Sequence, residues 1–218
     1  MDGCGHKILG RVVTGITVIV MVLNLLVLSG RASGQESEPQ AIRVPLKRGN
    51  VIPAINLLLD TCPDIPNGDF ESGLTMWKEY SSGGYSLINN SGFPIYLTPH
   101  SGSWAVWQGG AHNETSQIQQ QVTVPSNCPY LVFYHYIATE DIHCSPSYDT
   151  GFTRINGTDV VDTVYLCMAN NTFGWVVKSI DLSAYAGQSV LLQIGVKTDS
   201  YDHSHWYIDD VSFQAKNQ

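Results

Sequence analysis

Apolar and polar residues alternate with a period of two in several short runs of this chain. In residues 116–124 the apolar Ile118, Val122 and Val124 share one parity, and glutamine and threonine occupy the other. The same alternation runs through residues 190–197. Consecutive side chains of a β-strand point to opposite faces of the sheet, so each run predicts a strand with one buried and one solvated face.

Other short runs add to the predicted strand count. Residues 130–137 are apolar or aromatic on both parities apart from His135, which predicts a strand covered on both sides. Residues 152–155 and 160–165 flank Asn156-Gly157, a pair typical of two-residue hairpin turns. In total, we expect about nine to eleven strands along the chain. We therefore expect an all-β fold, an antiparallel β-sandwich of jelly-roll type.

The N-terminal part of the chain has a different pattern. Lys7 and Arg11 precede an apolar run at residues 12–28, and small residues follow it, which is typical of a signal peptide spanning residues 1–34. The run is also just long enough for an uncleaved apolar membrane helix, and this alternative stays open. Residues 35–61 are expected to be a linker, residues 62–214 the sandwich and residues 215–218 a tail.

Charge and cysteine content indicate the cellular compartment of the protein and limit the classes of partner that it can bind. Residues 1–34 hold three of the 11 basic and one of the 19 acidic residues, so the exported part carries 8 basic and 18 acidic side chains. That surface disfavours nucleic acid, and membrane contact is expected only if the N-terminal segment is uncleaved. Four exported cysteines predict two disulfides in a secreted protein. Three pairings are open, and we expect Cys62–Cys128 and Cys144–Cys167.

Two motifs at the ends of the predicted sandwich are similar to known families. The opening motif is Asn67-Gly68-Asp69-Phe70-Glu71, followed by Trp77, and the closing one is Trp206-Tyr207-Ile208-Asp209-Asp210-Val211. Together they resemble jelly-roll carbohydrate-binding modules of galactose-binding-like fold, and also MAM-type adhesion domains. Ser101-Gly102-Ser103-Trp104 and residues 181–188 look like accessory domains of secreted bacterial metallopeptidases and surface proteins.

The resemblance implies a structural calcium ion held by the first and last strands lying side by side. Its side-chain ligands would be Glu71 and Asp209, with backbone carbonyls near Asp69 and in the loop that ends at Ser103. Asp209 shares the parity of Tyr207, Val211 and Phe213, so we expect an inward carboxylate that needs a positive partner. A local bulge would exchange the roles of Asp209 and Asp210.

The resemblance also implies a carbohydrate ligand, an extracellular polysaccharide or a cell-surface glycan. Sugar rings stack on exposed aromatic side chains, and the tryptophans at 77, 104, 107 and 175 are expected in the core. The aromatic residues beside polar or glycine-rich loops are the better candidates: Tyr85, Tyr96, Tyr148, Tyr201 and Trp206. The alternative function is a structural or adhesion module that binds a secreted protein.

Catalysis is not expected. His203 and His205 share one strand face, but a zinc site needs a third or fourth ligand and no HExxH motif is present. Glu140-Asp141 and Asp149 are acids close in sequence, which more often bind a cation or face water than act as a glycosidase pair. No GxSxG motif is present either. The sequence therefore predicts a secreted, non-catalytic binding domain.

Overall fold

The computed structural model describes residues 61–94 and 97–216 of this chain. The expected signal peptide, most of the expected linker and the end of the expected tail lie outside those residues, so these predictions stay predictions. In the described part no helix is both long and apolar enough to cross a membrane. The 3-10 turns that lie wholly within the described residues are Met168–Asn170 and Ser183–Tyr185.

The described residues form ten strands in two sheets. The strands are β1 (Lys78–Ser81), β2 (Ile88–Asn89), β3 (Ala105–Gly109), β4 (Thr115–Thr123), β5 (Tyr130–Thr139), β6 (Thr150–Ile155), β7 (Asp159–Tyr165), β8 (Val176–Asp181), β9 (Ser189–Lys197) and β10 (Ser204–Gln214). Sheet A has the order β1-β4-β9-β6-β7, and sheet B has the order β2-β3-β10-β5-β8. Every pairing is antiparallel. The predicted all-β antiparallel sandwich is confirmed.

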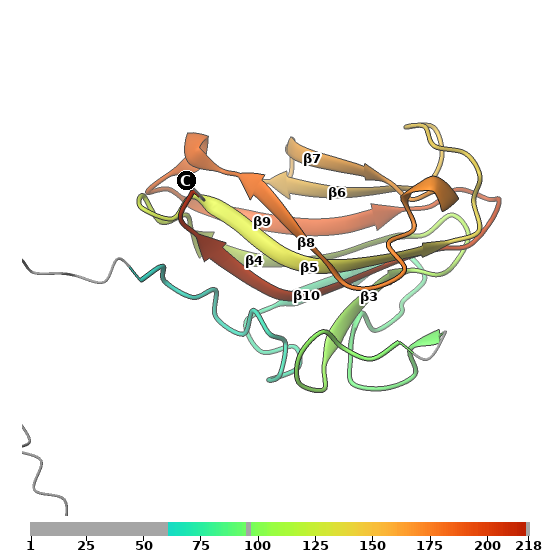
Figure 1. Cartoon of the computed structure of the whole chain (residues 1–218), viewed down its shortest axis with the longest axis horizontal. Coiled ribbons are helices and arrows are strands. Elements are labelled where there is room, and N and C mark those ends of the chain that lie inside the picture. The colour runs from blue at the N-terminus through green and yellow to red at the C-terminus, as the bar shows by residue number, and fades with distance from the viewer. Residues whose placement is uncertain (1–60, 95–96, 217–218) are drawn as a thin grey trace, which may run out of the picture. The chain divides into compact units, whose positions relative to one another are not determined.

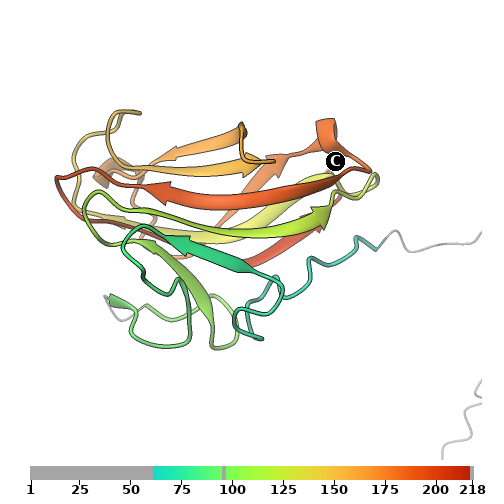
Figure 2. The same cartoon turned by 180° about the vertical axis from the view of Figure 1, so that it is seen from behind.

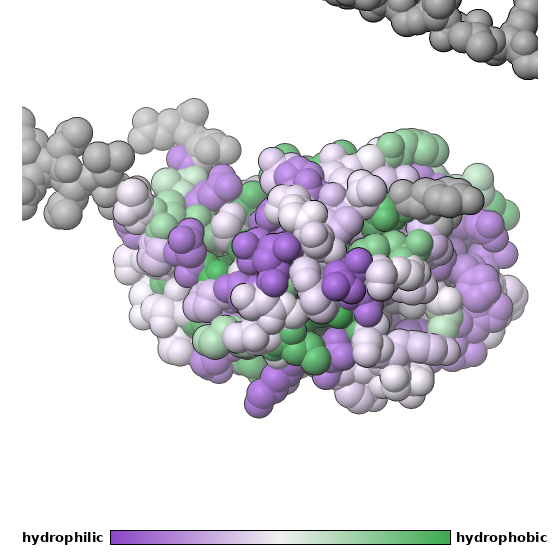
Figure 3. Space-filling model, turned by 90° about the horizontal axis from the view of Figure 1, so that it is seen from below, coloured by the Kyte–Doolittle hydropathy of each residue, from purple (hydrophilic) through white to green (hydrophobic). Residues whose placement is uncertain are grey.

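The two sheets pack face to face around one apolar core. Figure 1 shows β8, β5, β10 and β3 of sheet B in front, and Figure 2 shows β1, β4 and β9 of sheet A from the other side. The alternation predicted for residues 116–124 and 190–197 places one side of β4 and of β9 in this core. The largest core side chains include Phe70, Phe133, Leu192 and Trp206, all fully buried. The face seen from below in Figure 1 carries apolar residues in separate small patches among polar ones (Figure 3).

The opening motif meets the closing strand, but through a loop. The first strand, β1, pairs with β4 in sheet A and β10 lies in sheet B, so the expectation that the first and last strands lie side by side is wrong. Instead the backbone N–H of Val211 in β10 donates to the carbonyl of Gly68, at 2.8 Å. A side chain at Gly68 would place its Cβ 2.0 Å from the Val211 carbonyl oxygen. The motif needs glycine there because the two backbones touch.

A β-bulge divides β10. The register against β5 shifts between Asp209 and Ser212, and Asp210 has a φ of 51°. Before the bulge Trp206 and Ile208 face the core, and after it Val211 and Phe213 do. Tyr207 and Asp209 therefore lie on the outer side of sheet B, and their expected inward position is wrong. The extra residue of the bulge reverses the parity that the sequence pattern assumed.

Both expected disulfides are present. Cys62 bonds to Cys128, which ties the entry of the domain to the loop before β5. Cys144 bonds to Cys167, which joins the loop after β5 to the segment after β7. The predicted hairpin is also present, since Asn156 and Gly157 connect β6 to β7 with positive φ angles of 53° and 82°. These constraints brace the two ends of the sandwich.

Candidate ligand-binding face on sheet B

The outer side of sheet B carries a row of aromatic side chains. Tyr207 in β10 is the register partner of both Trp107 in β3 and Tyr136 in β5, so the three lie side by side across the sheet. Ring centroids are 6.3 Å apart for Trp107–Tyr207 and 6.0 Å for Tyr136–Tyr207. Trp175, just before β8, extends the row at 6.2 Å from Tyr136. We call Trp107, Tyr207, Tyr136 and Trp175 the aromatic row.

A hollow of about 500 Å³ opens over one part of this row. Its lining combines two members of the row with residues of β5, β10 and nearby loops: Pro94, Trp107, Gly110, Tyr136, Ile137, Ala138, Thr139, Glu140, Asn171, Phe173, His203 and His205. Phe173 is 86% exposed, so its ring stands in solvent at the rim. The hollow therefore offers apolar ring faces beside a carboxylate, an amide and imidazoles, which is the chemistry of a site for a polar organic ligand.

Hydrogen bonds fix the orientation of the groups that line the hollow. The indole N–H of Trp107 donates to Nδ1 of His205 at 3.0 Å. Burial lowers the pKa of His205, so this imidazole is neutral at neutral pH and can accept that bond. Asn171 accepts from the backbone N–H of Thr139 at 2.9 Å and donates to its carbonyl at 3.0 Å. The site is held in place without a ligand.

A loop covers the other end of the aromatic row. His100 stacks on Tyr134 with ring centroids 3.5 Å apart, and Trp175 donates its indole N–H to the carbonyl of Thr98 at 2.9 Å. Phe93 meets Tyr207 edge to face at 6.2 Å. Tyr207 is fully buried under these neighbours, so it supports the row but cannot itself stack on a ligand. Trp107, Tyr136 and Phe173 are the accessible indole and phenyl rings that line the hollow.

The structure changes the choice of candidate ligand-binding residues. Trp206 is fully buried in the core, so its predicted role on the surface is wrong. Trp107 and Trp175, expected in the core, lie in the aromatic row of the outer face. Trp107 lies in a strand of five residues and Trp175 lies just before β8, so neither has an alternation long enough to show which side faces inward. Tyr96 lies outside the described residues.

The remaining predicted tyrosines fall in two other places. Tyr85 is 56% exposed and lines a second hollow of about 370 Å³, which shares Trp107 and Gly110 with the first. Tyr148 and Tyr201 lie together, with ring centroids 6.4 Å apart, beside His143. Tyr201 is 63% exposed. None of these three lines the first hollow.

The predicted calcium ligands gather around one loop, residues 100–104. Glu71 Oε1 accepts the backbone N–H groups of Ser103 and Trp104 at 2.7 and 2.8 Å. Asp209 Oδ2 accepts those of His100 and Ser101 at 2.9 and 3.2 Å. The two predicted carboxylates are therefore brought to the same loop from opposite ends of the domain sequence.

The other two acidic residues of the predicted site contribute less. Asp210 contacts the side chains of His100 and Ser101, whereas Asp209 accepts their backbone N–H groups. Asp69 accepts the backbone N–H of Glu71 at 3.4 Å and is exposed. The described residues contain no group of three or more His, Cys, Asp or Glu side chains placed to hold a metal.

Backbone donors supply the positive partner that the sequence predicted for Asp209. Its carboxylate is fully buried and accepts three backbone N–H groups, from His100, Ser101 and Asp210. Burial nevertheless raises its pKa to about 7. The buried charge alone therefore does not require a cation. The Glu71 carboxylate packs so closely on Gly102 that a side chain there would meet it.

The outer face of sheet A has a different character. Gln117, Gln119 and Gln193 form a hydrogen-bonded chain across β4 and β9, at 3.3 and 3.0 Å. Gln121, further along β4, donates separately to the hydroxyl of Ser189 in β9 at 3.0 Å. These amides mostly satisfy one another. The aromatic side chains beside them include Phe152, covered by Arg154 at 4.3 Å, and the exposed Tyr80, the register partner of Gln117 in β1. Sheet B is thus the aromatic face and sheet A the amide face.

Comparisons with known families and with curated proteins found no match. Solved structures share the fold. TmCBM61, solved in complex with β-1,4-galactotriose, has a TM-score of 0.50 at 13% identity and covers 70% of this chain and 97% of its own. The K3 cleaved adhesin domain of Lys-gingipain from Porphyromonas gingivalis has a TM-score of 0.49 at 14% identity, with 70% and 100% covered. The chain has a β-sandwich fold of the kind found in carbohydrate-binding modules.

Proposed function

We propose that residues 62–214 form a non-catalytic module that binds an extracellular glycan on the outer face of sheet B. The observation that carries this proposal is the hollow between Trp107, Tyr136 and Phe173, bordered by Glu140, Asn171 and His203. Pyranose rings present C–H groups on their faces and hydroxyls at their edges. Ring faces beside fixed polar groups match both features.

Preorganisation supports this site over the others. Trp107 and Asn171 are each held by side-chain hydrogen bonds, at 3.0 and 2.9 Å, and the aromatic row lies on rigid strands. A ligand that binds such a face loses little free energy to ordering the protein. Trp107 also borders the second hollow with Tyr85, so an oligosaccharide could extend across both sides of its ring.

The module is proposed to act outside the cell. Two disulfides in a domain of this size are typical of an oxidising compartment. We also propose that the sandwich is of the jelly-roll class and that residues 1–34 are a signal peptide. The acidic surface favours neutral or cationic ligands over nucleic acid.

We also propose calcium near Glu71 and Asp209 as a structural ion. The two carboxylates hold residues 100–104, and Glu71 Oε2 with nearby backbone carbonyls would supply the oxygen ligands. The ion would brace the loop whose His100 stacks on Tyr134 at the end of the aromatic row. It has no part in chemistry on the ligand.

The experiment is a screen of the purified chain on immobilised polysaccharides and a glycan array, with β-1,4-galactan, xylan and β-glucan among the probes. We expect retention on at least one of them, and its loss in the Trp107→Ala variant. Binding unchanged by that substitution would place the ligand elsewhere. If the chain is retained by no glycan and captures a secreted protein instead, the adhesion alternative replaces this proposal.

A further inference from the structure

Two fully buried aspartates lie near the Cys144–Cys167 disulfide and have no role in the site described above. Asp141 follows β5, and Asp149 directly precedes β6. Both side chains are 0% exposed. In each of them Oδ2 is buried with no hydrogen-bond partner among the described residues. A buried carboxylate oxygen without a partner costs several kcal/mol, so this pair calls for a ligand or a proton.

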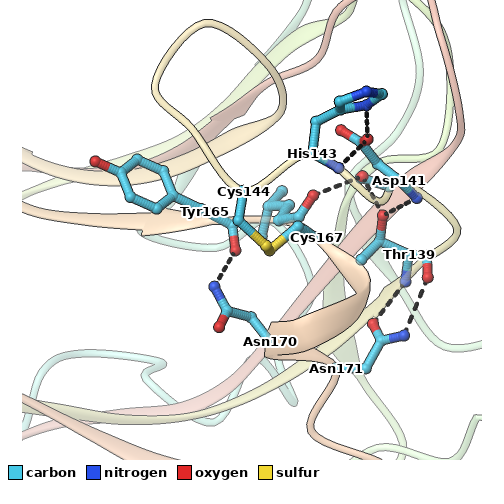
Figure 4. The surroundings of a disulfide bond; sticks show 10 residues. Thr139, Asp141, His143, Cys144, Tyr165, Cys167, Asn170 and Asn171 are labelled. Carbon is cyan, nitrogen blue, oxygen red and sulfur yellow. Dashed lines mark hydrogen bonds and ion pairs between the residues drawn. A yellow bond between two sulfur atoms is a disulfide. The ribbon is translucent and has the colours of Figure 1, made fainter.

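The other oxygen of each aspartate is occupied. Asp141 Oδ1 accepts the backbone N–H of His143 at 2.7 Å and lies 2.9 Å from its Nδ1 (Figure 4). Asp149 Oδ1 accepts the backbone N–H of Asp199 at 2.6 Å. The carboxylates are therefore fixed by their Oδ1 atoms, which leaves both Oδ2 atoms for something else.

Uncharged oxygens connect the two aspartates. The hydroxyl of Thr139 accepts the backbone N–H of Asp141 at 3.0 Å and lies 2.6 Å from the hydroxyl of Ser204. Ser204 reaches the Leu166 carbonyl at 3.3 Å and is one of the side chains that interact with the Asp149 carboxylate. Thr139 and Ser204 are themselves buried, so uncharged oxygen atoms lie close to both aspartates.

The charge of this cluster is not balanced by lysine or arginine. Of the ion pairs formed by described residues, one reaches the cluster, and it joins Asp141 to the half-exposed His143. Asp149 has no cationic partner, and Asp199 and Asp141 both act on it electrostatically. A hard cation would neutralise the pair and would use both free Oδ2 atoms.

We propose that Asp141 and Asp149 bind a calcium ion through their Oδ2 atoms, at a site separate from Glu71 and Asp209. Hydroxyl and carbonyl oxygens from Thr139, Ser204 and Leu166, together with water, would complete the oxygen shell. Ca²⁺ accepts six to eight oxygen ligands in variable geometry, which suits a mixed set of this kind. The ion would join the loop after β5 to the start of β6 beside the disulfide.

The test uses thermal melts of the full chain after chelation, with and without added Ca²⁺. We expect Ca²⁺ at about 100 times its Kd to raise Tm by about 5–10 °C in the unmodified chain. Asp149→Asn should remove the part of the rise that this site supplies. Because the neutral amide also relieves the unbalanced charge, the chelated variant should melt at or above the chelated parent. Asp141→Asn is the second variant with the same expected loss.

Two controls separate this site from other effects of Ca²⁺. Asp202→Asn changes an exposed acid just before β10, the strand that begins with Ser204, and should leave the Ca²⁺-dependent rise in Tm intact. Glu71→Gln disrupts the other proposed calcium site. It should leave the part of the Ca²⁺-dependent rise in Tm that requires Asp149. A rise that is absent in the parent, or equal in the parent and in both aspartate variants, would overturn the proposal. Neither result depends on whether the chain binds a glycan.

Discussion

Trp107 and His205, from neighbouring strands of sheet B, form a hydrogen bond in which the indole N–H donates to Nδ1 at 3.0 Å. Their rings lie 5.7 Å apart, and both residues line the hollow on the outer face. The bond requires an unprotonated Nδ1. The orientation of the tryptophan of the aromatic row that lines both hollows therefore depends on the charge of a histidine.

Glycan affinity should depend on pH through this pair. Burial lowers the pKa of His205, so affinity should be constant from pH 8 to 6.5 and should fall only at more acidic pH. Loss of one hydrogen bond of about 1 kcal/mol corresponds to about a fivefold loss of affinity. Titrations with the retained polysaccharide at several pH values measure this. His205→Gln should bind with little dependence on pH, and an equal acid loss in that variant would exclude His205 as the cause.

A second tryptophan–histidine pair controls stability instead of binding. Trp206 donates its indole N–H to Nδ1 of His135 at 3.0 Å inside the core, and burial lowers the pKa of His135 to about 4. Between pH 6.5 and 4 the unfolded chain binds a proton on His135 that the folded chain does not. The free energy of unfolding should fall by about 3 kcal/mol over this range because of His135.

The measurement is chemical unfolding of the parent and of His135→Gln across that pH range. Asp209 acts in the opposite direction, because its raised pKa of about 7 lowers stability as pH rises from 4. The difference between the two proteins cancels the contribution of Asp209. That difference should shrink as the pH falls, and a constant difference would show that His135 titrates normally.

The contact between the opening motif and β10 should make Gly68 intolerant of any side chain. Gly68→Ala would place a methyl group 2.0 Å from the Val211 carbonyl oxygen, so backbone atoms must move. We expect a loss of about 2 kcal/mol or more in the free energy of unfolding. Gly174→Ala is the matched control, since nothing lies within 4 Å of its added Cβ. Equal effects of the two substitutions, measured by denaturant unfolding, would mean that the motif does not touch β10.

Removal of either disulfide should lower the free energy of unfolding. The loss should be greater for the disulfide that closes the longer loop. Cys62–Cys128 spans 66 residues and Cys144–Cys167 spans 23. Chain entropy predicts losses of about 4 and about 3 kcal/mol for the paired alanine variants. Denaturant unfolding measures both values. A negligible loss for the longer loop would show that the N-terminal entry does not hold the sandwich together.

The sequence predicted the sandwich because its signals are local. Alternation in β4 and β9 and the Asn156-Gly157 turn each report on a few consecutive residues, and the structure confirms them. The expected cysteine pairing also agrees with the structure. Patterns formed by a few consecutive residues therefore predict the strands and turns of this fold directly.

The aromatic face could not be predicted in the same way. Trp206 and Trp107 exchange their expected environments, because β3 is five residues long and a bulge at Asp210 interrupts β10. The hollow also combines residues from β3, β5, β10 and five loops, which no sequence spacing relates. Sequence motifs located the carboxylates near residues 100–104, yet not the backbone donors that occupy them.

The most direct test of the account is the affinity of the retained glycan for face-specific variants, measured by calorimetry. Trp107→Ala and Tyr136→Ala remove accessible rings of sheet B, and each should weaken binding by about tenfold or more. Gln117→Ala on the amide face of sheet A and Tyr201→Ala beside His143 should bind like the parent. If instead the sheet B variants bind normally and Gln117→Ala or Tyr201→Ala does not, the ligand does not bind the aromatic row.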